Sequence, residues 1–267
     1  MEQFIILKNR AVISVSGEDR KIFLQGLITN DINKVSETQA IYTLMLSPVG
    51  RFLYDFFIIE KDDKFLLDCD KERVDEVVQK FSFYKLRSKV EIKKENLIVV
   101  SGGKIGFADP RNSQMGYRNF ISNTELKDCN LEYNFQRINL KLSDDSDLTY
   151  DKSFPLEFGF DDLNAIDYKK GCYVGQETTA RTHYKGTIRK KIFVVEVLDC
   201  NQISKGSEIE AEDKKIGEIL SSVFYENKLF ALALIKNLDN EGKEINLENL
   251  PLIVITAEES KAIKIIK

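Results

Sequence analysis

The sequence has one histidine, four cysteines and no long run of apolar residues. Because His183 is the only histidine, a Ser-His-Asp site has one possible base, and a multi-histidine metal centre is excluded. No C-x-x-C pair, the usual spacing of a structural zinc site, occurs among Cys69, Cys129, Cys172 and Cys200. These shortages argue against most hydrolases and metalloenzymes, and we predict no bound metal.

No segment approaches the roughly 18 consecutive apolar residues that span a bilayer. The first ten residues also lack the basic start and apolar stretch of a secretion signal. We therefore expect a cytoplasmic protein without a membrane partner, or a mitochondrial matrix protein in a eukaryote, although no transit peptide is visible. A net charge of −4, from 39 basic and 43 acidic residues, gives no overall field that would attract nucleic acid.

The composition that remains is typical of a folded globular protein. The 267 residues are 43% hydrophobic and 31% charged, and at about 150 residues per domain the length suggests about two domains. After Arg189, short β segments joined by polar turns replace mixed helices and strands. We predict an α+β body over residues 1–190, followed by a small antiparallel β-barrel over residues 191–267.

Apolar periodicity predicts the elements of the body. A strand is expected over AVISVS. The helix after it is expected to point three apolar side chains toward the core, those of Ile22, Phe23 and Leu27. A three-stranded meander is expected over QAIYTLMLS, RFLYDFFIIE and FLLDCD. A further helix is predicted by apolar residues at helical spacing, namely Val74, Val77, Val78 and Phe81. Two shorter helices are predicted over ISNTELKDC and LEYNFQRINLKL.

The most unusual segment is KKGCYVGQETTARTHYKGTIR, residues 169–189, which combines glycines, a cysteine, an amide beside an acid, and several bases. If its glycines form a turn that opens a helix at Gln176, Cys172 lies near backbone N–H groups and beside lysines. Such surroundings favour the reactive thiolate. The alternative is that Cys172 is a small buried filler, as free cysteine often is.

Other residues of this segment allow two interpretations. Gln176 and Glu177 could bind a ligand, or Glu177 could pair with Arg181 four residues further along a helix. His183 is predicted to lie in a solvated polar loop.

A family resemblance is carried first by the segment KGCYVGQETTAR, which is similar to the signature of the YgfZ family of folate-binding proteins, relatives of the glycine cleavage T-protein. The residues that follow, THYKGTIRKK, are similar to its mitochondrial iron-sulfur assembly members. Four more blocks resemble the family in its own order: VSGEDRKIFLQGLITNDI, LSPVGRFLYDFFI, FADPRNSQMGYR and FPLEFGFDDLNAIDY. Five ordered blocks make the family assignment stronger than any single residue does.

The resemblance implies two interlocked α+β subdomains and a barrel, arranged like a ring around a pocket for tetrahydrofolate or another reduced folate. It also implies a role in assembling or repairing iron-sulfur clusters on [4Fe-4S] enzymes, including radical enzymes that modify tRNA. The implied partners are iron-sulfur client or assembly proteins. The family motif implies catalytic roles for Cys172, as the functional thiol, and for Lys170. It implies cofactor-binding roles for Tyr173, Gln176, Glu177 and Arg181.

The chain departs from its relatives in two ways at the implied folate pocket. The T-protein has adjacent acids on the strand after its paired glycines, whereas here Asp55 is the one acid left. Glu157 and four upstream aspartates are alternatives for the acid that holds the pterin. The chain has no tryptophan, and Phe135 replaces one that YgfZ uses in its pocket. Phe135 could stack on a folate ring or be a core residue.

Three functional hypotheses follow. The leading one is a folate-dependent accessory protein for iron-sulfur cluster assembly. The second is an aminomethyltransferase that transfers a methylene group to tetrahydrofolate, which the missing acid disfavours. The third is a binding scaffold that has the fold but no folate site. Whether the chain is an enzyme stays open.

Overall fold

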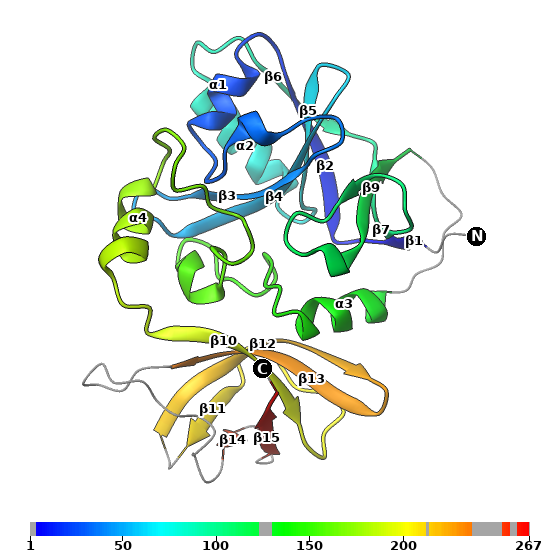
Figure 1. The fold of residues 1–267 in the computed structure, drawn as a ribbon, viewed down its shortest axis with the longest axis vertical. Helices are drawn as coiled ribbons and strands as arrows, with labels where there is room; N and C mark the ends of the chain where they lie inside the picture. Colours follow the sequence, from blue (N-terminus) through cyan, green and yellow to red (C-terminus); the bar gives the residue numbers. More distant parts are fainter. Residues whose placement is uncertain (1–3, 123–129, 212–213, 237–252, 257–260, 267) are drawn as a thin grey trace. The chain divides into compact units, whose positions relative to one another are not determined.

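The computed structural model describes residues 4–122, 130–211, 214–236, 253–256 and 261–266 (Figure 1). Contacts divide the chain into two compact units, each built from several segments. The first unit consists of Met1–Asn130, Tyr150–Lys152 and Phe160–Arg181, and the second of Leu131–Thr149, Ser153–Gly159 and Thr182–Lys267. The domain boundary expected at residue 190 stays a prediction.

The larger sheet of the first unit is antiparallel, with strand order β3-β4-β5-β2-β6. Its strands are β2 (Arg10–Ser16), β3 (Ile41–Leu46), β4 (Phe52–Lys61), β5 (Lys64–Asp70) and β6 (Glu91–Glu95). The predicted three-stranded meander is confirmed, since β4 pairs with both β3 and β5. Every residue of β3 is buried, so this part of the sheet is covered on both faces.

Helices α1 (Arg20–Gln25) and α2 (Val74–Lys85) lie side by side in the first unit (Figure 1). The rings of Phe23 and Phe81 meet edge to face at 5.8 Å, and Val77 is fully buried, as predicted. The expectation for α1 is wrong at Ile22, which is 79% exposed. Successive helical residues point about 100° apart, so a one-and-a-half-turn helix that buries Phe23 and Leu24 turns Ile22 outward.

A second antiparallel sheet in the first unit has the strand order β1-β7-β9-β8. Its strands are β1 (Phe4–Ile6), β7 (Ile98–Gly102), β8 (Phe107–Ala108) and β9 (Tyr117–Ile121), and the short helices η1 (Ile32–Lys34) and η2 (Ser113–Met115) also belong to this unit. The helix predicted over ISNTELKDC starts within β9. Its remainder at 123–129, including Cys129, lies outside the described residues.

The second unit contains α3 (Asn130–Asn139), as predicted from LEYNFQRINLKL, and η3 (Pro155–Phe158). Its strands are β10 (Lys190–Val197), β11 (Glu208–Ala211), β12 (Lys214–Tyr225), β13 (Lys228–Lys236), β14 (Ile253–Thr256) and β15 (Lys261–Ile265). They pair in the order β10-β13-β12-β11-β14-β15, and β15 also pairs with β10. The predicted small antiparallel β structure is confirmed. No helix in the described part of the chain has the length and hydropathy of a membrane span.

Candidate functional site

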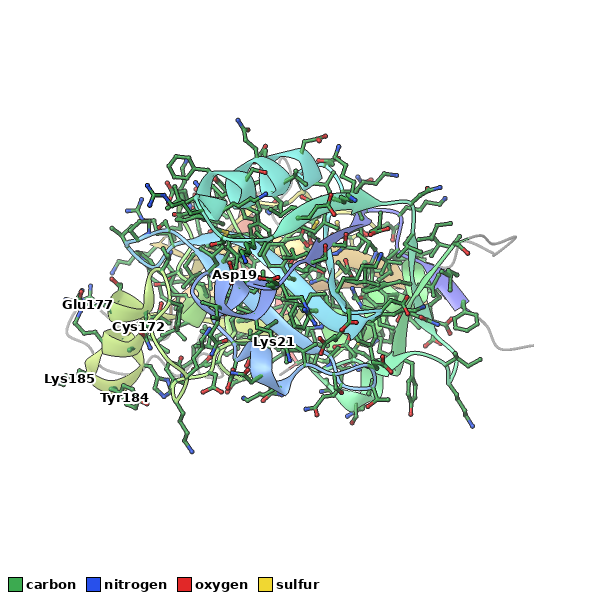
Figure 2. All side chains as sticks on the ribbon, turned by 90° about the horizontal axis from the view of Figure 1, so that it is seen from above. Asp19, Lys21, Cys172, Glu177, Tyr184 and Lys185 are labelled. Carbon is green, nitrogen blue, oxygen red and sulfur yellow. The ribbon has the colours of Figure 1, made fainter. Side chains whose placement is uncertain are left out.

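The KGCYVGQE segment forms a turn that leads into α4 (Gln176–Lys185), as its glycines predict. Gly175, directly before the helix, has a φ of +86°. Figure 2 shows Cys172 and Glu177 near the start of α4. Cys172 is exposed, so the interpretation of this residue as a buried filler is wrong. Cys69, by contrast, is buried, and that burial raises the pKa of its thiol.

Two glycines bring the cysteine segment into contact with the turn between β3 and β4. A side-chain carbon at Gly175 would lie 2.5 Å from the carbonyl oxygen of Ser47 and 3.2 Å from the Cα of Gly50. Gly50 itself has a φ of +80°, and a side-chain carbon there would lie 3.0 Å from the Cβ of Thr178. Such a close approach of two backbones requires glycine on both sides.

Lys170 attaches the cysteine segment to the loop that follows α1. Its Nζ donates hydrogen bonds of 2.6–2.9 Å to three backbone carbonyl oxygens, those of Gln25, Ile28 and Asn30. Burial lowers the pKa of the Lys170 ammonium to about 8, and the carboxylates of Asp31 and Asp167 act in the opposite direction. Three N–H donors are matched by three acceptors, so Lys170 positions the loop that carries Cys172. Its catalytic role stays a prediction.

Further hydrogen bonds fix the chain on its way to Cys172. The Thr29 hydroxyl donates to the carbonyl of Ala165 at 2.7 Å, and the Asn30 side chain donates to the carbonyl of Asn164, also at 2.7 Å. The backbone N–H of Asp167 donates to the carbonyl of Thr29 at 3.0 Å. We call residues 25–30, 47–51 and 164–175 together the cysteine platform. The sequence analysis did not predict a role for Thr29 and Asn30. Their position directly after an apolar helix could have indicated polar contacts to another segment.

The other motif residues differ in exposure. Tyr173 is 7% exposed, its ring centroid lies 5.1 Å from the Lys170 Nζ, and burial raises its pKa to about 12. Its hydroxyl has no hydrogen-bond partner among the described residues. Gln176 is half-buried, whereas Glu177 and Arg181 are exposed and form no ion pair with each other in the part of the chain described. The ligand contacts predicted for these residues stay predictions.

His183 lies within α4, not in the polar loop that we expected. Its ring meets that of Tyr184 edge to face, with 4.8 Å between the centroids. The expectation failed because α4 continues for ten residues through a sequence of polar and β-branched side chains, which have modest helix propensity.

Asp55 belongs to a buried ion network inside the first unit. It is 1% exposed, and its two oxygens accept hydrogen bonds from the Arg10 guanidinium at 2.9 Å and the Tyr42 hydroxyl at 2.7 Å. Asp68 accepts from Arg10 at 2.6 Å and also from Arg118. The carboxylate of Asp55 therefore has structural partners on both oxygens, and its predicted contact with a cofactor is not needed to explain its burial.

The Asp-Pro-Arg segment supports the same network. The Arg111 guanidinium donates to both carboxylate oxygens of Asp109, at 2.8 and 3.0 Å. Burial raises the pKa of the Asp109 carboxyl, but the Arg111 charge and hydrogen bonds outweigh this effect, and the net pKa lies below its usual range. Arg111 and Arg118 approach the Phe57 ring centroid at 4.7 and 3.6 Å. This sequence block thus has a structural function.

The remaining predicted cofactor residues lie in the second unit. Phe135 on α3 stacks on Tyr225 with 4.2 Å between ring centroids and meets Phe230 at 5.1 Å. Glu157 on η3 is half-buried; burial raises the pKa of its carboxyl, and the Lys190 charge partly opposes this shift. Of the upstream acids, two form ion pairs with Arg137, namely Asp144 and Asp147. Glu157 therefore stays a candidate for the acid that holds a pterin, as does Asp151, whose carboxylate forms no ion pair with another described residue.

No group of three histidine, cysteine or acidic side chains that could hold a metal ion occurs among the described residues.

Sequence comparisons find similarity to proteins named as iron-sulfur cluster assembly factors, although no family model matches the chain. The iron-sulfur cluster assembly factor IBA57 homolog, mitochondrial, of Mycosarcoma maydis is 33% identical over 219 residues, which are 69% of this chain and 54% of that protein. The mouse protein named iron-sulfur cluster assembly factor IBA57, mitochondrial, is 29% identical, over 75% of this chain and 69% of its own length. An uncharacterized protein of Haemophilus influenzae is 28% identical over 95% of this chain and 96% of its own.

The chain spans about half the length of the first of these curated relatives. Among solved structures, the crystal structure of the glycine cleavage system aminomethyltransferase T from Bartonella henselae matches with a TM-score of 0.75 and 13% sequence identity, covering 100% of this chain and 85% of that one. The chain therefore has a T-protein-like fold. Within this fold class, the chain belongs to the YgfZ family, close to its mitochondrial iron-sulfur assembly members.

Proposed function

We propose that this chain is an accessory protein for the assembly or repair of iron-sulfur clusters, with Cys172 as its functional thiol. The observation that carries the proposal is the exposure of Cys172 on the cysteine platform, where Lys170 and Gly175 fix the backbone on both sides of the thiol. The iron-sulfur role itself is suggested by the names of the relatives, which are cluster assembly factors.

A fixed and exposed thiol suits transient contact with a cluster that another protein holds. A single cysteine supplies one of the four ligands that a cluster requires, so the partner must supply the rest. We propose [4Fe-4S] enzymes as clients, including radical enzymes that modify tRNA. In a eukaryote, the mitochondrial names of the relatives support a matrix location.

We further propose that the protein uses tetrahydrofolate or another reduced folate. In the second unit, the half-buried Phe135 ring could stack on a pterin or benzoyl group, and the Glu157 carboxyl could accept hydrogen bonds from a pterin. A bound reduced folate would supply a carrier for a one-carbon group. The ring of strand pairings in this unit also supports the closed barrel that the family resemblance implies.

We expect replacement of Cys172 by serine to abolish [4Fe-4S] enzyme activity in cells that depend on this protein. Because the side chain is exposed, the free energy of unfolding should change by no more than about 0.5 kcal/mol. The matched control is Cys200→Ser, at a half-exposed cysteine in the second unit. Client activity is measured in extracts of complemented deletion cells. Full activity with Cys172→Ser would contradict the role of the thiol.

Isothermal titration calorimetry tests the cofactor. We expect saturable heat with tetrahydrofolate, and a Kd about twofold to tenfold weaker in Phe135→Leu, because an aromatic ring contact contributes about 0.5–1.5 kcal/mol. Thermal denaturation of the variant separates loss of binding from loss of fold. The absence of saturable heat with the wild-type protein would favour the scaffold hypothesis.

The aminomethyltransferase hypothesis is favoured by one observation, the fold shared with an aminomethyltransferase. Against it, the acid that remains at the start of β4, Asp55, is buried in an ion pair with Arg10. The test is to incubate the protein with an aminomethylated carrier and tetrahydrofolate. Release of ammonia and formation of methylene-tetrahydrofolate would show that the protein is an aminomethyltransferase.

A further inference from the structure

The three most exposed large apolar side chains of the described residues all lie on α1 or at the end of α2. Leu86 is 86% exposed, Ile22 79% and Phe83 74%. The two helices are neighbours in the first unit, joined through the Phe23–Phe81 ring contact (Figure 1). Phe83 and Leu86 are three residues apart at the end of α2, and exposed apolar groups that lie together mark interaction surfaces more often than singly scattered ones do.

A groove lies between the residue that precedes α1 and the segment that follows α2. It is lined by Asp19, Leu86, Arg87 and Ser88. The backbone N–H of Lys89 donates to the Asp19 carboxylate at 2.7 Å, which holds the start of α1 against the segment after α2. Because Ile22 follows Asp19 by about one helical turn, it lies on the groove side of α1.

The charge around the groove is positive, although the whole chain is negative. Residues 77–89 contain four basic residues, Lys80, Lys85, Arg87 and Lys89, and no acidic one. Glu18 pairs with Lys89 at 2.7 Å, so these two charges offset each other, and Asp19 binds the Lys89 backbone. Lys80, Lys85 and Arg87 form no ion pair with another described residue. Figure 2 looks onto this side of the unit and labels Asp19 and Lys21 at α1.

Leu86 ends α2 with φ 45° and ψ −109°. A positive φ is an uncommon, strained conformation for a leucine. Since the side chain is 86% exposed, the strain is not offset by burial within the unit. The conformation instead presents the leucine to solvent beside Arg87.

We propose that this surface binds an acidic segment of another protein. We call it the α2 patch and define it by Ile22, Phe83, Lys85, Leu86 and Arg87. The apolar side chains of the partner would cover the three exposed apolar residues, and its carboxylates would face the two basic ones. The proposal is independent of the iron-sulfur role and of Cys172.

Charge and shape argue against two other occupants. A second copy of the chain that docked through the same patch would bring like charges together, which disfavours that pairing. A flat membrane would leave the groove between Asp19 and Leu86 unfilled. An extended or helical peptide can fill the groove and satisfy the charges together.

The test uses the full chain as bait for a phage-displayed library of random 16-residue peptides, with the Phe83→Ser/Leu86→Ser double variant for counter-selection. The enriched peptides are synthesised, and their Kd values are measured by fluorescence anisotropy. We expect sequences rich in Asp and Glu that contain at least one Leu, Ile or Phe. Both the double variant and Lys85→Glu/Arg87→Glu should bind at least about tenfold more weakly.

Two substitutions elsewhere provide matched controls, Leu131→Ser at a 61% exposed leucine and Lys104→Glu at an exposed lysine. Both should leave the peptide Kd unchanged. Circular dichroism checks that the patch variants stay folded, as their exposure predicts. The proposal is overturned by enrichment of neutral or basic peptides, by no enrichment, or by equal binding to the patch variants. Patch-dependent binding to phosphatidylserine vesicles or patch-dependent self-association, without peptide binding, would also overturn it.

Discussion

Replacement of Gly175 by alanine is expected to destabilise the first unit by about 3 kcal/mol and to abolish the function of Cys172. The new Cβ would lie 2.5 Å from the Ser47 carbonyl oxygen and 2.9 Å from the Cβ of Leu46. The backbone φ of +86° adds strain of about 1–2 kcal/mol for any residue with a Cβ, and overpacking adds about 1–3 kcal/mol. To relieve both, the turn that carries Cys172 would have to move away from the β3–β4 turn.

A matched control separates contact from strain. Gly206 has a φ of +84°, but a Cβ there would have no neighbour within 4 Å. Gly206→Ala should therefore cost about 1 kcal/mol, from strain alone, and should keep client activity. Urea denaturation measures both costs. Equal losses of stability in the two variants would show that Gly175 is retained for its φ angle and not for the approach of the two turns.

The sequence around Cys172 predicted the backbone conformation of this segment. The glycines of KGCYVGQE predicted the turn, and the helix begins at Gln176 as expected. The contacts that fix this turn were not predictable, because they join residues far apart in the sequence. Lys170 binds carbonyl oxygens 140 to 145 residues before it, and nothing in the spacing of apolar residues identifies acceptors at such a distance.

The buried partners of Asp55 could not be predicted for a different physical reason. Strands β3 and β4 are buried on both faces, so alternation could not show which side chains face a ligand. An acid within the apolar run FLYDFFII must be paired if it is buried, and the same holds for Asp68 in FLLDCD. The pairing partners, Arg10 and Arg118, lie on other strands, and only the fold brings them to these acids.

Asp68 is the acid through which the buried network can be tested. Replacement of Asp68 by asparagine is expected to lower the free energy of unfolding by about 3–5 kcal/mol, the usual cost of removing one partner of a buried ion pair. The side chain is fully buried and pairs with Arg10 at 2.6 Å and with Arg118. Asparagine keeps the volume but removes the negative charge between two guanidinium groups, so the buried positive charge is less well compensated.

An exposed pair on the same unit provides the comparison. Glu18 and Lys89 are 2.7 Å apart, with 76% and 72% of their side chains exposed, so Glu18→Gln should cost about 0–1 kcal/mol. Urea denaturation at low and high salt distinguishes the two effects, because salt screens exposed charges much more than buried ones. The cost of Asp68→Asn should therefore be nearly the same at both ionic strengths. A cost as small as that of Glu18→Gln, or one that disappears at high salt, would mean that solvent compensates these arginines and that burial does not make the network essential to the fold.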